Sequence, residues 1–435
     1  MKAVIMAGGK GTRLHALTKD EIPKPMALLA NKPILEWQIE CLQRNHIFEL
    51  CIITGHLGEK IQEYFGDGSK FGVSICYFHE ETPMGTAGAL AHLTDFITEP
   101  SFLLVFGDVI FDIDVNRMEC FHRKQNAQAT LFVHPNSHPY DSDLVVLESN
   151  KRIIGFDSKA NIRSYWYDNI VNAGFYILSK EICDIIPDTG KTDLEKDILL
   201  KNHGKYNNIY GYISTEYIKD VGTIDRIRQA EQDICKGVVA AKNLSKKQRC
   251  IFLDRDGTIN EYKGLIFKPE ELVLEKTAAE AIRLINQSPF LAAIVTNQPV
   301  VARGLCTIEV LDEINRKLKT LLGKEDAYLD AVEFCPHHPD KGYPEENPAY
   351  KIPCNCRKPE IGMITKAAQL MNIDISRSWM VGDTRRDIQT AQNAGMRSVL
   401  VLTGEGGKDT VYPAEPDKVC NDILEAVKYI LQEEL

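Results

Sequence analysis

The stretch from Val4 to Leu14 reads VIMAGGKGTRL and gives the first strong indication of the fold. Its opening residues form a short apolar run that predicts a buried strand, and a glycine-rich turn follows directly. Glycine at positions 8, 9 and 11 lets backbone N–H groups approach a phosphate chain closely, and a following helix would add the positive end of its dipole. The pattern therefore predicts a strand, a turn and a helix that together bind a phosphorylated ligand.

This turn differs from two common nucleotide-binding loops. No Gly-Lys-Ser/Thr ends it, as a Walker A loop requires, and the third glycine of a Rossmann fingerprint is missing. A glycine-rich turn alone is more often a tight connection than a nucleotide site. Arg13, and then Lys24 within the sequence PKPM, add two cations that can hold phosphate oxygens. Their presence favours triphosphate binding.

A second stretch, from Cys250 to Thr258, reads CIFLDRDGT. Its apolar part predicts a buried strand, so Asp254 would emerge at the carboxyl end of that strand, where open parallel sheets bind ligands. Asp254 and Asp256 would point the same way from an extended segment, and magnesium would relieve the repulsion between their carboxylates. Surface turns and calcium loops also contain Asp-x-Asp, so this pair alone leaves those alternatives open.

Length and pattern indicate an α/β protein with two domains. At 435 residues the chain is too long for one ordinary core. Apolar runs alternate with amphipathic stretches in both halves, which favours two mostly parallel sheets flanked by helices. We predict a first domain at 1–235, with a strand-rich covering layer near 141–176, a linker at 236–248 and a second domain at 249–435.

The elements that position the motifs can be predicted by range. The predicted strands are 4–7, 50–54, 102–106, 250–253, 291–295 and 379–381. The predicted helices are 33–45, 224–235, 278–286 and 363–371.

Composition excludes some functions. A net charge of -10 without a basic patch gives no support for nucleic-acid binding. The first apolar run is too short for a signal sequence or a membrane span, so we expect a cytoplasmic protein without a membrane partner. Most of the 12 cysteines lie within apolar patterns, as buried thiols do in a reducing compartment. The sequence leaves the oligomeric state open, including a homo-oligomer.

Residues 1–235 resemble the sugar-1-phosphate nucleotidylyltransferases, particularly their mannose-1-phosphate guanylyltransferase-like branch. The resemblance rests on several motifs in family order: AGGKGTRL at 7–14, PKPM at 23–26, PMGTAG at 83–88, GD at 107–108, NAG at 172–174 and DVGT at 220–223. It implies a Rossmann-like nucleotide-diphospho-sugar transferase fold. It also implies a reaction in which a sugar 1-phosphate attacks the α-phosphorus of a nucleoside triphosphate and pyrophosphate leaves.

The resemblance also implies roles for individual residues. Arg13 and Lys24 would neutralise the reacting phosphates, and Asp108 and Asp220 would hold Mg²⁺. The implied nucleotide contacts are Gly8, Gly9, Gly11, Thr12, Gly85 and Thr86, and the implied sugar and sugar-phosphate contacts are Lys159, Asn172 and Gly174.

One departure from the family pattern affects the sugar site. Relatives commonly carry Glu-Lys-Pro there, whereas this chain has Ser158-Lys159-Ala160. The missing carboxylate changes which sugar hydroxyls can be read. Glu195 could supply a sugar contact instead, although a solvated helix face is an equally good interpretation of that residue.

The C-terminal part resembles the haloacid dehalogenase superfamily of phosphatases. Asp254-x-Asp256-Gly257-Thr258 is followed by Thr296-Asn297, Lys358-Pro359 and Gly382-Asp383 in family order. Here the resemblance implies that Asp254 forms an aspartyl phosphate and that Asp256 protonates the leaving oxygen and then activates water. Thr296 and Lys358 would hold the phosphoryl group. Asp254, Asp383 and the backbone carbonyl of Asp256 would bind Mg²⁺, while Asp387 would brace this loop.

Further motifs resemble D-glycero-D-manno-heptose 1,7-bisphosphate phosphatases, a family related to histidinol-phosphate phosphatases. They are NQP at 297–299, ARG at 302–304, CPHHP at 335–339 and CNCRKP at 354–359. Cys335, His337, Cys354 and Cys356 could close a tetrahedral structural Zn²⁺ site, with His338 as the alternative imidazole. Zinc would fix the loop that carries Arg357, which could read a second anionic group on the substrate. The ARG motif adds Arg303 and the NQP motif adds Asn297 as substrate contacts.

The two resemblances predict successive reactions. A phosphatase acting on heptose 1,7-bisphosphate would leave a sugar 1-phosphate, which a nucleotidyltransferase could join to GMP from GTP. Two alternatives remain open: a mannose- or glucose-1-phosphate nucleotidylyltransferase fused to another phosphatase, such as one for histidinol phosphate, or a regulatory protein that only binds ligands.

Overall fold

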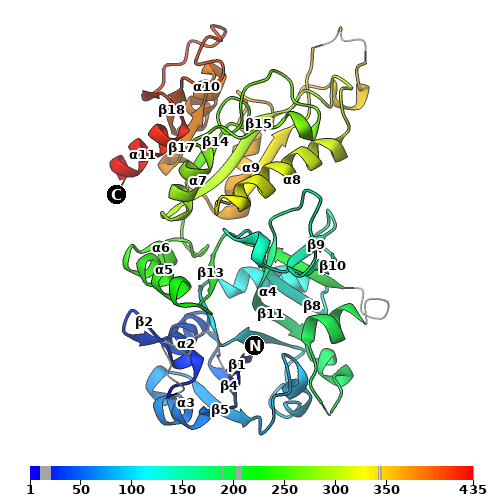
Figure 1. Cartoon of the computed structure of the whole chain (residues 1–435), viewed down its shortest axis with the longest axis vertical. Helices are drawn as coiled ribbons and strands as arrows, with labels where there is room; N and C mark the ends of the chain where they lie inside the picture. Colours follow the sequence, from blue (N-terminus) through cyan, green and yellow to red (C-terminus); the bar gives the residue numbers. More distant parts are fainter. Residues whose placement is uncertain (10–20, 189, 202–207, 341, 343–344, 435) are drawn as a thin grey trace. The chain divides into compact units, whose positions relative to one another are not determined.

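The computed structural model describes residues 1–9, 21–188, 190–201, 208–340, 342 and 345–434 (Figure 1). The chain forms two compact units. Unit 1 comprises Met1–His134, Val145–Asp157 and Asn172–Asn243, and unit 2 comprises Pro135–Leu144, Ser158–Val171 and Leu244–Leu435. Each unit contains an α/β sheet, as the alternating sequence pattern predicts.

The sheet of unit 1 has nine strands, in the order β10-β9-β11-β6-β1-β4-β5, with β8 next to β11 and β12 next to β8. The neighbours β6, β1, β4 and β5 are parallel, whereas β11 runs antiparallel to β6. Their bounds are β1 Ala3–Met6, β4 Glu49–Thr54, β5 Ser74–His79, β6 Ser101–Phe106, β8 Ala129–His134, β9 Leu144–Leu147, β10 Ile153–Asp157, β11 Val171–Ser179 and β12 Ile209–Ile213.

A separate antiparallel ribbon lies beside the site of unit 1. It pairs β7 (Val109–Asp112) with β13 (Tyr217–Asp220). The helices of this unit are α2 Ile34–Arg44, α3 Gly58–Phe65, α4 Val115–Lys124, α5 Ile224–Cys235, α6 Val238–Ala241 and the π-helical turn η7 Leu194–Leu200, and a 3₁₀ turn, η2, covers Lys24–Met26.

Unit 2 contains a six-stranded parallel sheet in the order β16-β15-β14-β17-β18-β19. The strands are β14 Arg249–Leu253, β15 Phe290–Asn297, β16 Ala331–Cys335, β17 Trp379–Gly382, β18 Arg397–Val401 and β19 Lys418–Cys420. The helices are α7 Ala278–Asn286, α8 Ile308–Lys324, α9 Gly362–Met371, α10 Arg385–Ala394 and α11 Ile423–Glu434.

The central strand β14 shows why this sheet is covered on both faces. Its side chains alternate, so that Ile251 and Leu253 pack with α7, α8 and α11, while Cys250 and Phe252 pack with α9 and α10. A strand that is apolar on both faces is typical of a parallel sheet buried between helix layers. The polar residues that follow such a strand therefore reach the edge of the sheet.

The predicted strands and helices are present, and where their ends differ they differ by one or two residues. The linker range 236–248 contains a helix, α6, because Val238 and Val239 bury their side chains in a core cluster of unit 1. The chain passes from unit 1 to unit 2 after Asn243. Ser158–Val171 belongs to unit 2, where the backbone N–H of Tyr167 donates to Thr320 Oγ1 of α8 at 3.0 Å.

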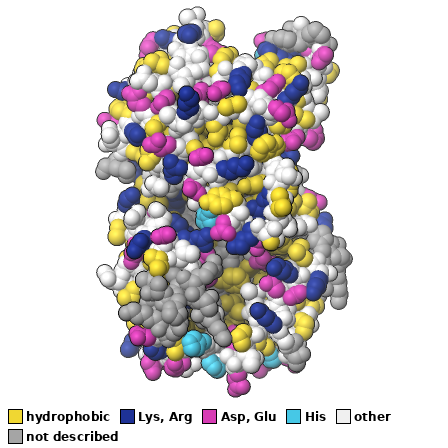
Figure 2. All heavy atoms as spheres, in the orientation of Figure 1, with side chains coloured by type: hydrophobic (Ala, Val, Ile, Leu, Met, Phe, Trp, Pro, Cys, Tyr) yellow, Lys and Arg dark blue, Asp and Glu magenta, His cyan; other side chains and the backbone are white. Residues whose placement is uncertain are grey.

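Two surface observations complete the fold. On the face in Figure 2, cationic and anionic side chains of the described residues are interspersed. Within the described part of the chain, no helix has both the length and the apolar character needed to cross a bilayer.

Candidate active sites

The site of unit 2 lies where three neighbouring strands end. Asp254 follows β14, Thr296 and Asn297 end β15, and Asp383 follows β17. Because parallel strands end at the same edge, these side chains converge. Carboxylate oxygens of Asp254, Asp383 and Asp387 all lie within 4.8 Å of one another, and all three residues are buried.

Lys358 enters this carboxylate group from the loop after β16. Its Nζ donates to Asp254 Oδ1 at 2.7 Å and to Asp387 Oδ1 at 2.5 Å. Burial lowers the pKa of Lys358, but Asp254 and Asp387 outweigh that effect and raise it overall. The side chain of Asn297 fixes this lysine in turn, since its amide bonds both the N–H and the C=O of Lys358.

The carboxylates are crowded and short of partners. Burial raises the pKa of Asp254 and of Asp383, and Asp387 adds to both shifts. Asp383 Oδ1 is buried and accepts no hydrogen bond from the described residues. Asp383 Oδ2 lies beside Gly257 and Gly404, where a Cβ atom would come within 2.3 and 2.1 Å of it. A divalent cation fits this donor set, because it would satisfy the unpaired oxygen and relieve the repulsion.

Asp256 is held by three side chains. Arg255, which is fully buried, donates to both of its oxygens at 3.0 Å. Asn260 donates to Oδ1 at 3.0 Å, and Gln298 donates to Oδ2 at 2.7 Å. Gln298 also donates to Thr296 Oγ1 at 3.0 Å, so one amide links Asp256 to Thr296.

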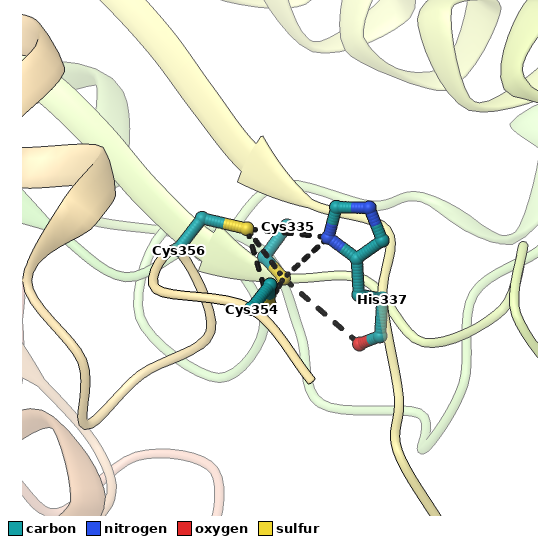
Figure 3. A group of neighbouring side chains, drawn as sticks. All are labelled: Cys335, His337, Cys354 and Cys356. Atoms are coloured by element: carbon teal, nitrogen blue, oxygen red, sulfur yellow. Dashed lines mark hydrogen bonds between the residues drawn. The ribbon is translucent and has the colours of Figure 1, made fainter. Parts of the chain in front are cut away.

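The four predicted zinc ligands meet in one cluster (Figure 3). Their sulfur–sulfur distances are 3.1, 3.3 and 3.5 Å, and His337 Nδ1 lies 3.3 Å from Cys356 Sγ and 3.7 Å from Cys335 Sγ. A tetrahedral site with Zn–S bonds of about 2.3 Å has sulfur–sulfur edges of about 3.8 Å. His338 lies outside the cluster, where its Nδ1 accepts the N–H of Asp340.

The loop that carries the Cys335, His337, Cys354 and Cys356 cluster also contains Arg357 and His338. Arg357 Nη1 donates to the carbonyl of His337 at 3.2 Å. Burial lowers the pKa of His338, and the charges of Arg357 and Arg303 lower it further. Both guanidinium charges therefore act on the His338 imidazole.

The site of unit 1 begins at the ends of β1, β4 and β5. Gly8 and Gly9 follow β1. Gly11, Thr12 and Arg13 lie outside the described residues. The carboxylate of Glu80, directly after β5, lies against Gly8, where a Cβ atom would come within 2.6 Å of Glu80 Oε2. Glu80 Oε1 accepts the N–H of Met84 at 3.3 Å, and burial raises the pKa of this carboxyl.

The predicted metal ligands of unit 1 lie at one end of the β7–β13 ribbon, where Asp108 precedes β7 and Asp220 ends β13. Val109 pairs with Asp220, so Asp108 and Asp220 are neighbours across the two strands. Lys24 Nζ lies 2.5 Å from Asp108 Oδ2 and 3.9 Å from Asp220 Oδ1. Arg226 Nη1 donates to Asp220 Oδ2 at 2.5 Å. Asp220 Oδ1 is buried without a hydrogen bond from the described residues, so this carboxylate pair also fits a cation.

Gly85 and Thr86 contact the chain at the start of η7, and Asn172 contacts Glu195 within it. Gly85 has a φ of +85° and lies against the backbone of Thr192, while Thr86 Oγ1 accepts the N–H of Leu194 at 2.8 Å. This contact fixes the start of η7 and hence Glu195.

Glu195 belongs to a small polar cluster. Its Oε1 accepts hydrogen bonds from Asn172 Nδ2 and from Tyr176 OH. Gly174, between them in sequence, has a φ of +72° and no room for a Cβ beside Phe106. The structure thus brings Glu195 and Asn172 together. Lys159 belongs to unit 2 and pairs with Asp141 at 3.3 Å.

Several site residues were not predicted from the sequence. They are Glu80, Tyr176, Arg226, Arg255, Gln298 and Gln38. Arg255 and Gln298 stand inside recognised motifs and could have been found there. Glu80 carries no local signal, because its approach to Gly8 depends on the register of β4 and β5. Gln38 lies in an amphipathic helix and carries no signal of its own.

Comparison with known proteins relates each part to a family. A family model described as nucleotidyl transferase matches residues 2–237, and one described as HAD-hydrolase-like matches residues 355–426. The chain is similar to a D-glycero-alpha-D-manno-heptose 1-phosphate guanylyltransferase of Aneurinibacillus thermoaerophilus, with 32% identity over 234 residues, 54% of this chain and 98% of the relative.

Two further relatives are similar to one part of the chain each. A D-glycero-D-manno-heptose-1,7-bisphosphate 7-phosphatase of Thermosynechococcus vestitus is 35% identical over 187 residues, 41% of this chain and 94% of the relative. A UTP–glucose-1-phosphate uridylyltransferase of Synechocystis is 33% identical over 214 residues, 46% of this chain and 55% of the relative. Similar N-terminal sequences therefore occur in proteins named for different nucleotides.

Proposed function

The chain belongs to the nucleotidyl transferase family through residues 2–237 and to the heptose-1,7-bisphosphate 7-phosphatases through its C-terminal part, and from this premise we propose one bifunctional enzyme. It removes the 7-phosphate of D-glycero-D-manno-heptose 1,7-bisphosphate and joins the resulting heptose 1-phosphate to GMP from GTP. The product is GDP-D-glycero-α-D-manno-heptose, a precursor for surface polysaccharides such as lipopolysaccharide.

One observation carries the proposal: each unit has an aspartate–lysine–aspartate group built into its site. In unit 2 Lys358 bonds Asp254 and Asp387, and in unit 1 Lys24 approaches Asp108 and Asp220. Both reactions move a phosphorus group between oxygens, and both need cations to offset the charge of the transferring group. Two such groups on one chain support two phosphorus-transfer reactions.

In unit 2 the reaction proceeds through Asp254. Its carboxylate attacks the phosphorus at C7, and the bond from phosphorus to the C7 oxygen breaks as Asp256 gives that oxygen a proton. Asp256 then takes a proton from water, which attacks the aspartyl phosphate and releases inorganic phosphate. Lys358 and Thr296 hold the phosphoryl oxygens, and Arg255, Gln298 and Asn260 orient Asp256.

The two metals have separate tasks. Asp254, Asp383 and the Asp256 backbone carbonyl hold Mg²⁺ in unit 2, and Asp108 and Asp220 hold it in unit 1. When bound, Mg²⁺ supplies charge neutralisation for the transferring group. Cys335, His337, Cys354 and Cys356 would hold structural Zn²⁺, and its binding would stabilise the loop before Arg357 and Lys358. Arg303 and Arg357 bind the phosphate at C1, which stays on the sugar.

In unit 1 an oxygen of the sugar 1-phosphate attacks the α-phosphorus of GTP, and the bond to the β-phosphate oxygen breaks to release pyrophosphate. Lys24 and Arg13 offset the developing charge. Asn172 and Glu195 contact sugar hydroxyls, and the segments at Gly8–Gly9, Gly11–Thr12 and Gly85–Thr86 hold the nucleotide.

Glu80 supports the choice of guanine. A buried carboxylate accepts hydrogen bonds and offers none. Guanine presents two adjacent donors, N1–H and the 2-amino group, whereas uracil places carbonyl oxygens on both sides of its N3–H. Burial raises the pKa of Glu80, while the N–H of Met84 and the charge of His79 lower it, so two donors from a base would relieve the desolvation of this carboxylate.

Location follows from the thiols. All 12 cysteines are free, as expected in a reducing compartment, and a cytoplasmic location is part of the proposal.

The test is incubation of the purified chain with heptose 1,7-bisphosphate, GTP and Mg²⁺, followed by assays for phosphate, pyrophosphate and the nucleotide sugar. Asp254→Asn should stop phosphate release, yet still release pyrophosphate from heptose 1-phosphate and GTP. Asp108→Ala should show the opposite result. Release of neither product by the unaltered chain would refute the proposal, and turnover of mannose, glucose or histidinol phosphates instead would replace its substrate.

A further inference from the structure

A buried amide on α2 reaches the turn that carries Asp108. Gln38 is fully buried, and its Nε2 donates to the carbonyl of Phe106 at 2.9 Å and to the carbonyl of Val109 at 2.6 Å. These carbonyls belong to the last residue of β6 and the first residue of β7. The dipeptide Gly107-Asp108 lies between them. One side chain therefore closes both ends of this turn.

The hydrogen bonds of the Gln38 amide restrict which side chain can stand at this position. Both N–H groups of the amide are used, and Gln38 Oε1 is buried without a hydrogen-bond partner among the described residues. Leaving a buried oxygen unpaired is costly, so an apolar side chain would suit a purely structural position better. The two donated bonds are the gain that offsets this cost.

The opposite side of the turn is held by the backbone. Gly107 N–H donates to the carbonyl of Met6 at 2.9 Å, and Val221 N–H donates to the carbonyl of Asp108 at 3.0 Å. A Cβ atom on Gly107 would come within 2.9 Å of the Met6 carbonyl, so the turn packs against β1 with no room for a side chain at this position. With Gln38 on the other side, the backbone of Asp108 is fixed from two directions.

We propose that Gln38 is a positioning residue for the transferase reaction, because it fixes the turn that aims the Asp108 carboxylate at its cation. This inference rests on the proposed function, in which Asp108 and Asp220 hold Mg²⁺. Gln38 touches neither substrate nor metal. Outer partners of metal ligands typically change metal affinity by about 10- to 100-fold when they are replaced.

A matched control lies on the same helix. Asn45, at the cap of α2, donates through Nδ2 to the carbonyl of Ile113 at 2.9 Å, and its Oδ1 accepts the N–H of Val115 at 2.8 Å. It therefore fixes the far end of β7 with the same kind of bonds as Gln38, but away from Asp108. A substitution there disturbs packing to a similar degree without acting on the metal turn.

The experiment measures Mn²⁺ binding directly, by electron paramagnetic resonance on the full chain without substrate. Every variant also carries Asp383→Asn, which weakens the metal site of unit 2. The Mn²⁺ bound to unit 1 is then the part of the bound Mn²⁺ signal that is lost when Asp108→Ala is added. We expect Gln38→Met to weaken this Mn²⁺ site about 10-fold or more and to speed amide exchange at 107–109. Asn45→Leu should lower the melting temperature and leave the Mn²⁺ site unchanged.

The outcomes separate this inference from the proposed function. Unchanged Mn²⁺ affinity in Gln38→Met, or equal weakening in Asn45→Leu, would overturn the positioning role, as would the absence of any Mn²⁺ signal that depends on Asp108. If Gln38→Met does not fold, Gln38→Asn takes its place, because it keeps the amide and is one methylene shorter. Failure of both variants to fold would also overturn the positioning role. An intact Mn²⁺ site without GTP turnover would defeat the proposed function alone.

Discussion

Replacement of Glu80 by glutamine should change which nucleotide the transferase accepts. The substitution keeps the length of the side chain and one acceptor, so the bond from the N–H of Met84 can remain. It removes the charge and turns one acceptor into a donor. Guanine N1–H can still bond the amide oxygen, but the 2-amino group of guanine then faces the amide N–H₂.

The magnitude follows from the bond that is lost. A hydrogen bond to a charged group contributes about 1.5–3 kcal/mol, and two opposed donors in a buried site add a desolvation cost. We therefore expect a loss of about 3 kcal/mol with GTP, which corresponds to about 150-fold in kcat/KM. The same amide offers one donor and one acceptor, as uracil requires, so kcat/KM with UTP should rise.

The assay is pyrophosphate release from heptose 1-phosphate with GTP, UTP, CTP and ATP in parallel. Glu81→Gln serves as the matched control, because Glu81 is the exposed neighbour in sequence and should keep the unaltered preference. Phosphate release from heptose 1,7-bisphosphate reports that unit 2 is intact. A Glu80→Gln enzyme that retains kcat/KM for GTP within threefold and gains nothing with UTP would refute this account of base selection.

Three further predictions concern the remaining groups. Lys358→Met should slow phosphate release about 100- to 1000-fold and spare pyrophosphate release; comparable loss of both would contradict separate sites. Cys356→Ser or zinc chelation should lower the melting temperature of unit 2 by about 5 °C or more, and an unchanged calorimetric trace would argue against structural zinc. Burial raises the pKa of Glu80, so the folded chain binds the proton of this carboxyl more tightly than the unfolded chain does. The stability that this difference contributes is fully present below the ordinary glutamate pKa, and it is lost as the pH rises through the raised pKa of the folded state. Glu80→Gln should flatten that part of the stability profile, which urea titrations at several pH values would measure.

The sequence predicted the site residues that lie at or directly after the end of a buried strand. Asp254, Thr296 and Asp383 each follow or end a buried apolar run, and parallel strands bring such residues to one edge. The cluster of Cys335, His337, Cys354 and Cys356 was also predictable, because two short pairs of residues with metal-ligating side chains favour one common site. In these cases local pattern and chemistry determine the neighbours.

Other contacts depend on how distant segments pack. The approach of Glu80 to Gly8 arises from the register of β4 and β5, and no local pattern encodes it. Gln38 reads as one polar position in an amphipathic helix until β6 and β7 are placed beside it. The segment 158–171 was predicted within the first domain from its order in the chain, whereas its contacts with α8 group it with unit 2.

The short distance in sequence between Cys356 and Lys358 ties a catalytic ammonium to a cluster of thiols. In the proposed function Zn²⁺ joins those thiols, and its loss would release the peptide that aims the ammonium at Asp254. A cell starved of zinc would then accumulate the bisphosphate, one step before GTP is spent. The supply of zinc would in this way limit how much GTP the second reaction consumes.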